Sequence, residues 1–576
     1  MRKTIFWRYP ARLSFFRMDD RLLLISIGVI VGLFSGLAAV GLNRSLIFML
    51  EGLYHLRHLW WAFLLPAAGA MASSIFLEKI MKEGAGHGIP EVIYSVSRYG
   101  GLLRFRSSFS RLISSSLTIG SGGSAGPEAP VVMSGAAIGS TIARFFYLND
   151  RQRTTLVGCG TAGAIAGIFN APLTGLIFTM EIILGEWSMV NIIPIAVAAV
   201  AGAEISRILQ GNSIAFESSG FHITGVDLFA SLGLAVVAAF ASILLTRGLR
   251  RMHGVSVKIK IPMWVKASIG GAAVGLLGFF VPEVLGEGYH SIHDMIQGVF
   301  KGGIGIAALA FFAKIFATSL TLGWGGSGGI FAPCLVIGSF AGLAFHRLLA
   351  FGFPGTPLVN EGCFALLGMA GLISGILQAP LTGIFLILEI TASYEVMLPL
   401  IIVSVISTTV THYFEPDSFY HKDLKERGEL LRPGTDSRVL ADIGIREVIE
   451  TDCITVSPQM LLREFFHLLK HSTRNYFPVE DPETGEFLGI VELGDVRSYI
   501  FNTVMYDTVF VEQIMNSNPD VVHYDDNLAD VLETMDAKSR FSMPVVSNNR
   551  FVGMVSKATL LDKYRDELNV QTSQAF

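Results

Sequence analysis

The sequence predicts an α-helical polytopic membrane protein whose C-terminal part is a soluble pair of α/β modules. Three observations lead to this prediction: long uncharged apolar runs, a duplication inside the apolar body, and a second duplication in an acidic tail. Of the 576 residues, 51% are hydrophobic and only 16% are charged, whereas soluble domains carry about 25% charged residues. The composition of the chain is therefore not that of a soluble globular protein.

The apolar runs are long enough to cross a bilayer. Residues 22–42 carry no charge, and about 20 apolar residues suffice for one helical span. The run is too long for a cleaved signal peptide. Further uncharged runs lie at 59–77, 187–202, 267–281 and 328–345. Several are short or interrupted by Gly and Pro, which predicts tilted and broken helices within a membrane domain at 21–425.

Charge is unevenly distributed along the chain. Residues 1–440 hold 32 Lys/Arg against 25 Asp/Glu, and residues 441–576 hold 11 against 22. The segment 1–20 carries five basic residues, Arg2, Lys3, Arg8, Arg12 and Arg17. By the positive-inside rule this segment should lie in the cytoplasm. We expect the tail on the same side, and the apolar body in a bacterial-type inner (plasma) membrane. The four cysteines have no paired spacing, so neither disulfides nor a metal site is expected. No nucleic-acid partner is expected.

The first duplication organises the membrane body. TIGSGGSAGPEAP at 118–130 matches TLGWGGSGGIFAP at 321–333, with eight of 13 positions identical at an offset of 203. GIFNAPLTGLIFTMEI at 167–182 matches GILQAPLTGIFLILEI at 375–390, with nine of 16 identical at an offset of 208. The body is therefore two related halves, about 20–215 and 225–425. Such repeats with Gly/Pro-interrupted segments indicate a binding site near the bilayer midplane.

The glycine clusters admit more than one interpretation. Close helix packing explains any single Gly-rich stretch in an apolar protein. A dinucleotide-binding loop is disfavoured because no βαβ unit surrounds the glycines. In both copies the cluster precedes an Ala-Pro that suits a helix start. Converging helix N-termini with free N–H groups form a weak, non-covalent anion site.

The second duplication lies in the tail. NYFPVED at 475–481 matches FSMPVVS at 541–547, and FLGIVELGDV at 487–496 matches FVGMVSKATL at 551–560. Each copy alternates extended segments and helices, which predicts two small α/β modules at 448–503 and 509–569. A charged linker, 426–447, joins them to the membrane body.

Four short motifs in the body resemble those of the CLC family of chloride channels and chloride/proton antiporters. They are GHGIP from Gly86, GPEAP from Gly126, GGIFAP ending at Pro333, and the tyrosine of PDSFY. The tail resembles a CBS-domain pair. The resemblance implies a CLC-type inverted repeat that transports chloride across the lipid bilayer, with cytoplasmic CBS modules. It also implies the anion-binding residues His87, Gly88, Ile89, Pro90, Gly126, Gly329, Ile330, Phe331 and Tyr420.

Glu128 is the strongest candidate for a functional side chain. It stands between glycine and proline at an expected helix start inside an uncharged run, and an ionisable residue at membrane depth is costly. The corresponding residue of the second half is Phe331, so the fold does not require a carboxylate there; a helix-start carboxylate is the structural alternative. In the resembled family this glutamate is the gate: ionised, it competes with chloride, and protonated, it leaves the path open.

The sequence departs from the family pattern at two positions in the body. His87 replaces the usual pathway serine, so the preference for chloride over nitrate or another anion stays open; the backbone of this turn is an alternative ligand. FTMEI places Glu181 at the family's structural glutamate and Ile182 at its internal proton-transfer glutamate. Isoleucine carries no proton, which favours a voltage- or pH-gated channel; a chloride/proton antiporter is the alternative.

The CBS modules depart as well. Nucleotide-binding modules commonly end in G-h-x-[ST]-x-x-D. The first module keeps Asp495 but has Glu492 in place of the hydroxyl, and the second keeps Ser556 but has Thr559 in place of the aspartate. No cofactor is required by this reading. There are two alternatives for these modules. Either they bind ATP or another adenosine nucleotide at Asp495 and Ser556, or they have a purely structural or dimer-contacting role.

These observations together predict a homodimer with one Glu128-gated anion pathway in each subunit and no enzymatic activity. A CBS-linked divalent-cation transporter would need clustered carboxylates in the membrane, and the apolar runs offer too few. A non-transporting membrane sensor would not need matched motif pairs in the body. Both alternatives therefore rank below anion transport.

Overall fold

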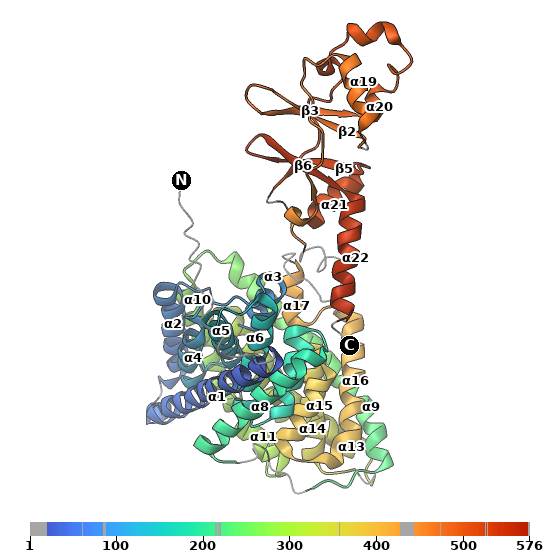
Figure 1. Ribbon diagram of the computed structural model, residues 1–576. Helices are drawn as coiled ribbons and strands as arrows, with labels where there is room; N and C mark the ends of the chain where they lie inside the picture. Colours follow the sequence, from blue (N-terminus) through green and yellow to red (C-terminus); the bar gives the residue numbers. More distant parts are fainter. Residues whose placement is uncertain are drawn as a thin grey trace. The chain divides into compact units, whose positions relative to one another are not determined.

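The structure is a computed structural model that describes residues 20–53, 55–59, 61–84, 88–212, 216, 220–355, 358–426, 443–472, 474–524, 526 and 528–573. The chain divides into two compact units, residues 1–430 and 431–576, and each is described by itself. The first is helical and the second mixes helices with short strands (Figure 1). The predicted segment 1–20 and most of the predicted linker 426–447 lie outside the described residues.

In the described part of the membrane unit, the α-helices form two runs of eight in matching order. The first run is α1 (Asp20–Gly52), α2 (Leu65–Ile75), α3 (Ile89–Tyr99), α4 (Ser107–Gly120), α5 (Glu128–Phe145), α6 (Asp150–Phe169), α7 (Pro172–Phe178) and α8 (Met189–Gln210). The second is α9 (Gly225–Lys258), α10 (Met263–Phe280), α11 (Tyr289–Ile296), α12 (Ile304–Gly323), α13 (Phe331–Gly352), α14 (Glu361–Leu377), α15 (Pro380–Thr391) and α16 (Met397–Phe414). A further helix, α17 (Phe419–Glu426), follows.

Corresponding helices pack in corresponding ways. The pair α5 and α6 is in close contact, as is its counterpart α13 and α14, and α1 packs on α8 as α9 packs on α16. Helices α2 and α10 contact each other across the halves, as do α7 and α15. The halves therefore share one fold and meet through equivalent elements.

The helices suit a bilayer in length and surface. Among the described residues, eight helical segments are long and apolar enough to cross a membrane. The unit also exposes large apolar side chains, including Phe48, Phe229, Phe279, Phe312 and Phe351. A soluble protein would bury most of these side chains, whereas lipid solvates them. The predicted class of a polytopic α-helical membrane protein is confirmed.

The helices are broken at the places that the duplicated motifs predict. Helix α4 ends at Gly120 and α5 begins at Glu128, while α12 ends at Gly323 and α13 begins at Phe331. The two breaks meet: the Gly126 N–H donates to the Gly329 oxygen at 2.9 Å, and the Gly329 N–H donates to the Gly126 oxygen at 2.7 Å. This reciprocal pair places the start of α5 beside the start of α13.

Side chains reinforce the junction in the same reciprocal way. The Ser124 N–H donates to Thr321 Oγ1 at 3.1 Å, and the Ser327 N–H donates to Thr118 Oγ1 at 3.2 Å. Each pair is the other's counterpart at the offset of 203 residues. The backbone polar groups of both breaks are thus satisfied inside the protein, as membrane depth demands.

The second unit contains two α/β modules that exchange their leading segments. In the first module, β2 (Tyr476–Glu480) pairs with β3 (Phe487–Glu492), with α19 (Leu462–His471) before them and α20 (Leu493–Val496) after them. In the second, β5 (Ser542–Ser547) pairs with β6 (Arg550–Ser556), and β4 (Val522–His523), α21 (Leu528–Ala537) and α22 (Lys557–Ser573) complete it. The predicted strand and helix order is confirmed.

The exchange of leading segments joins the modules tightly. Strand β1 (Ile449–Glu450), which leads the first module, pairs with β6 of the second. In the same way Asn516, which leads the second module, bridges to Ile490 in β3 of the first. Each module has its own apolar core, and Ile443 and Ile445 pack in the core of the second module. The pair therefore forms one unit.

Candidate functional site

Glu128 occupies the start of two helices at once. It is the first residue of α5, and its side chain is fully buried. The Phe331 N–H, the first amide of α13, donates to Glu128 Oε1 at 2.5 Å. A carboxylate at a helix N-terminus is stabilised by the unpaired N–H groups and the helix dipole. Glu128 of the first half thus binds the helix start of the second half.

The backbone around this carboxylate leaves little room. A Cβ at Gly126 would lie 2.1 Å from Glu128 Oε2, and a Cβ at Gly329 would lie 2.4 Å from Oε1. Only glycine at both positions lets the carboxylate lie against the reciprocal bridge. The glycines of GPEAP and GGIFAP therefore shape the seat of Glu128.

Two buried oxygens near this seat lack hydrogen-bond partners within the described part of the chain. One is Glu128 Oε2 and the other is the Tyr420 hydroxyl. Tyr420 comes from α17, is 1% exposed, and interacts electrostatically with Glu128. A buried hydroxyl without an acceptor costs about 1–3 kcal/mol. An anion in reach of Tyr420 would accept a hydrogen bond from its hydroxyl and remove that cost.

Helix α3 adds a third helix start. It begins at Ile89, with Pro90 in its first turn, and follows Gly88, whose φ of 85° favours glycine. A Cβ at Gly88 would lie 3.2 Å from the Ala129 oxygen in α5. Helix α3 packs against both α5 and α17. Gly86 and His87 of the predicted anion-binding turn lie outside the described residues.

Phe331 is held by aromatic contacts. Its ring centroid lies 5.4 Å from that of Phe178 and 6.4 Å from that of Phe169, and the side chain is 1% exposed. Ile330 is also buried. Packing fixes the first turn of α13, so that its amides stay directed at the Glu128 carboxylate. The structure thus brings Glu128, Phe331 and Tyr420 together with the starts of α3, α5 and α13.

Comparison with known proteins decides the family. Residues 68–412 match the model of the voltage-gated chloride channel family, and residues 445–502 and 511–566 each match the CBS domain. The chain belongs to the voltage-gated chloride channel family. It carries a CBS pair after its membrane unit, as the sequence predicts.

Relatives and solved structures agree with this assignment. A ClcB-like chloride channel protein of Ralstonia nicotianae is 30% identical over 65% of this chain and 88% of its own length. The H(+)/Cl(-) exchange transporter ClcA of Vibrio cholerae is 31% identical over 60% of this chain and 75% of its own. The fold resembles a slow cyanobacterial Cl−/H+ antiporter (TM-score 0.65, 22% identity, 71% and 98% coverage) and a eukaryotic CLC transporter (0.62, 18%, 94% and 99%).

Within this family member, Glu181 and Glu389 have equivalent contacts. Glu181 accepts the Thr382 N–H at 2.8 Å and the Thr382 hydroxyl at 2.7 Å, at the start of α15. Glu389 accepts the Thr174 N–H at 2.7 Å and its hydroxyl at 2.6 Å, at the start of α7. Each glutamate therefore caps the helix start of the other half, which is a structural role.

Ile182 is buried and apolar. It lies in the π-helical turn Thr179–Leu184 and is 2% exposed. Its neighbour Glu181 is engaged by α15. The turn contacts α3, the helix whose start lies beside α5. The chain therefore offers no titratable side chain at position 182.

The CBS residues selected from the sequence are engaged by the protein itself. Asp495 Oδ2 accepts the Glu492 N–H at 2.9 Å, which closes the first turn of α20. The Ser556 hydroxyl donates to Glu450 Oε1 at 2.6 Å, and the Thr559 hydroxyl donates to the same oxygen. Glu450 also pairs with Arg474. A carboxylate thus occupies the hydroxyl donors that a nucleotide phosphate would need, and the surroundings of Ser556 do not fit one.

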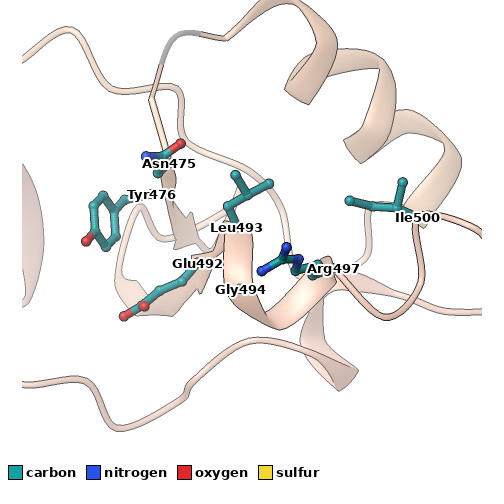
Figure 2. A pocket seen from close by; sticks show the side chains of 7 residues that line it. All are labelled: Asn475, Tyr476, Glu492, Leu493, Gly494, Arg497 and Ile500. Atoms are coloured by element: carbon teal, nitrogen blue, oxygen red, sulfur yellow. The ribbon is translucent and has the colours of Figure 1, made fainter.

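A shallow cavity lies in the first module. Its volume is about 440 Å³, and Figure 2 shows its lining residues Asn475, Tyr476, Glu492, Leu493, Gly494, Arg497 and Ile500. Glu492 pairs with Arg540 of the second module at 2.9 Å. Arg497 supplies one positive charge that would attract a phosphate, and the negative charge of Glu492 would repel it. Asp495, the predicted ligand, does not line this cavity.

Sequence reasoning missed two charged residues of the membrane unit. Lys314 is fully buried in α12, and Glu287 lies in the turn before α11. The signal was available, since a lone lysine inside the apolar run of α12 is unusual at membrane depth. The acidic residue stands in GEGY at 286–289, a short match to GHGI at 86–89.

Proposed function

We propose that this protein conducts chloride across the membrane and that Glu128 is the gate. One observation carries the proposal: the Glu128 carboxylate accepts the first amide of α13, Phe331, and interacts electrostatically with Tyr420, whose hydroxyl has no hydrogen-bond partner within the described residues. That seat holds one negative group on hydrogen-bond donors without a full positive charge. Such weak binding suits conduction, because the ion must also leave.

The gating step follows from competition for the seat. Ionised Glu128 fills the helix start of α13 and excludes an anion. A protonated carboxyl binds these donors less strongly, so the side chain can leave and chloride can take its place. Acid therefore opens the pathway, and the flux rises as the external pH falls.

The anion-binding residues of the proposed pathway follow its three helix starts. Gly88, Ile89 and Pro90 belong to α3, Gly126 precedes α5, and Gly329, Ile330 and Phe331 lead into α13. Tyr420 completes the set. His87 stays a candidate ligand from the sequence, with anion preference open to test by exchanging chloride for nitrate.

A channel is favoured over an exchanger by Ile182. A proton cannot pass through an isoleucine, and Glu181 is bound to the start of α15. The alternative is a chloride/proton antiporter, which the names of relatives such as the Vibrio cholerae ClcA exchanger favour. The two differ in whether protons move with chloride.

The experiment that separates them uses the full chain in liposomes. A chloride gradient is imposed and the reversal potential is measured, first at equal pH and then across a pH gradient. A channel keeps the chloride reversal potential in both conditions, whereas a shift with the pH gradient demonstrates coupling. Absence of any chloride flux would contradict the proposed function itself.

We also propose a homodimer, which the resemblance to the double-barrelled CLC family implies. Each subunit would have its own pathway, because a single chain supplies Glu128, Phe331 and Tyr420. The basic residues before the first span support a cytoplasmic N-terminal segment, and we propose that the CBS pair lies on the same side. Cross-linking in membranes tests the dimer. Protease protection of the CBS pair in sealed vesicles tests its side. The proposal requires no bound nucleotide or metal and no enzymatic step.

A further inference from the structure

A third pair of matched turns lies in the membrane unit. GHGI at 86–89 and GEGY at 286–289 are 200 residues apart, close to the offsets of the other repeats. Gly88 and Gly288 have φ values of 85° and 83°, and each directly precedes a short helix, α3 and α11. The turns are therefore counterparts, and Glu287 stands where the first half has His87.

A buried basic residue holds each turn. Arg111 and Lys314 are separated by the same 203 residues as Glu128 and Phe331. Arg111 Nη2 donates to the Gly84 oxygen at 3.0 Å, just before the first turn. Lys314 Nζ donates to the oxygens of Val284 at 3.0 Å and Gly286 at 2.9 Å in the second. The second half thus repeats the arrangement of the first.

The base is shared by both halves but the acid differs: Arg111 pairs with Glu83 and Glu91, whereas the second turn carries Glu287 where the first has His87. Lys314 is fully buried within a membrane helix, where an ammonium needs a partner. Its electrostatic partner is Glu287. Lys314 Nζ binds the Gly286 oxygen on one side of Glu287, and a Cβ at Gly288 on the other side would lie 3.2 Å from the same nitrogen. Packing alone would not require it to be acidic.

The second turn lies close to the gate. The Gly286 N–H donates to the Gly122 oxygen at 3.2 Å, in the break that leads to Glu128. A Cβ at Gly288 would lie 2.8 Å from Val336 of α13. Glu287 and Glu128 interact electrostatically. The turn therefore contacts both elements that form the seat of Glu128.

Few other ionisable groups share this space. Lys314 from α12 acts on Glu287, Glu287 acts on Glu128 of α5, and Tyr289 follows Glu287 in its own chain segment. The Tyr289 hydroxyl is buried without a partner in the described part of the chain. Glu128 also acts on Tyr420 and Cys334. Among the described residues, the charges near the gate thus come from Glu128, Glu287 and Lys314.

We propose that Glu287 and Lys314 form a second charged site on the pathway and that their charges set the pH at which Glu128 opens. The inference rests on the proposed gating by Glu128. With Glu287 ionised, the charge of Lys314 is balanced. With Glu287 neutral, the ammonium favours ionised Glu128 and holds the gate closed. Glu287 and Lys314 therefore act through Glu128 and are positioning residues.

The test measures chloride efflux from liposomes that contain the full chain, as a function of external pH. Glu287→Gln should move the midpoint of the pH response about one unit lower, the size expected of one nearby charge at the effective dielectric of proteins. Lys314→Met should move it in the opposite direction. Asp294→Asn, on helix α11 after this turn, removes an acid that acts on neither Glu287 nor Glu128 and should keep the wild-type midpoint.

A pair with a merely structural role would not shift the pH midpoint in opposite directions in Glu287→Gln and Lys314→Met. If Glu287→Gln does not fold, Glu287→His introduces the residue that the first half has at the corresponding sequence position, and it should shift the midpoint lower too. Wild-type midpoints in the folded variants at both positions would overturn the inference. In the Glu128→Gln background, Glu287→Gln should have no effect. A Glu128→Gln protein that keeps its pH response would instead overturn the proposed gate.

Discussion

The two halves of the membrane unit share a fold but differ at the seat of the gate. Glu181 and Glu389 are identical residues that cap α15 and α7 through matching bonds to Thr382 and Thr174. At the paired helix starts, by contrast, the first half has Glu128 and the second has Phe331, whose amide binds that glutamate. Residues that the halves share thus hold the fold. The proposed gate, by contrast, is a residue in which the halves differ.

The largest effect is expected from filling the seat of the gate. Gly126→Ala would place a Cβ 2.1 Å from Glu128 Oε2, and the flexible carboxylate would have to leave the α13 amide. We expect chloride flux to lose most of its pH dependence without loss of the fold. Flux in liposomes at several external pH values measures this.

A matched glycine provides the control for that substitution. Gly41→Ala in α1 adds a methyl group with nothing within 4 Å and should leave the pH response unchanged. Gly329→Ala, from the second half, should act like Gly126→Ala, because its Cβ would lie 2.4 Å from Glu128 Oε1. A normal pH response in both Gly126→Ala and Gly329→Ala would show that the carboxylate does not need this seat.

The symmetric glutamates should affect stability and not gating. Glu181→Gln and Glu389→Gln each weaken hydrogen bonds between a carboxylate and a helix start, which cost about 1–3 kcal/mol when lost. We expect similar decreases in thermal stability for the two purified variants. The midpoint of the pH response should stay that of the wild type. A pH midpoint displaced only by Glu181→Gln would make Glu181 part of proton transfer and favour the antiporter.

The smallest effect is expected on nucleotide binding by the CBS pair, whose two modules also differ in their motif residues. Glu450 occupies the hydroxyl donors of Ser556 and Thr559. We expect ATP to bind the detergent-solubilised full chain weakly, and Glu450→Ala to strengthen binding several-fold by freeing these donors. Calorimetry measures both affinities, with Glu483→Ala as an exposed acidic control. Tight wild-type binding that Ser556→Ala abolishes would support a nucleotide site instead.

The ion pair between Arg474 and Asp452 in the CBS pair gives a testable direction for the pKa of Asp452. The Arg474 guanidinium holds the pKa of Asp452 below its usual value. Arg474→Gln should therefore raise the pKa of Asp452 toward that of a free aspartate, as followed by NMR of the side-chain carboxyl. The sign follows because a lowered pKa means that the ion pair favours the charged form. An unchanged pKa would show that this pair does not form in solution.

Much of the fold could be predicted from the sequence because its signals are local. Matched Gly/Pro motifs located the breaks before Glu128 and Phe331, and alternating segments gave the CBS modules. The contact of Glu128 with the Phe331 amide could not be predicted, since it joins residues of different halves. The capture of Ser556 by Glu450 could not be predicted either, because it depends on β1 pairing with the strand of the other module.

Glu287 was missed for a related reason. Its motif match to the turn at His87 is short, and only the shared positive φ of Gly88 and Gly288 shows that the turns correspond. Lys314 was visible as a lone lysine in an apolar run, but its partner lies in another segment. Contacts between segments that are distant in the chain thus could not be predicted from the sequence.

The most direct test of the central claim is the pH dependence of chloride flux in Glu128→Gln. Glutamine keeps the size of the side chain and cannot ionise. The wild-type flux should rise as the external pH falls, following the titration of one group, which changes the charged-to-neutral ratio tenfold per pH unit. The variant should conduct chloride at every pH with no such dependence. A Glu128→Gln protein that retains the wild-type pH response would contradict the assignment of Glu128 as the gate.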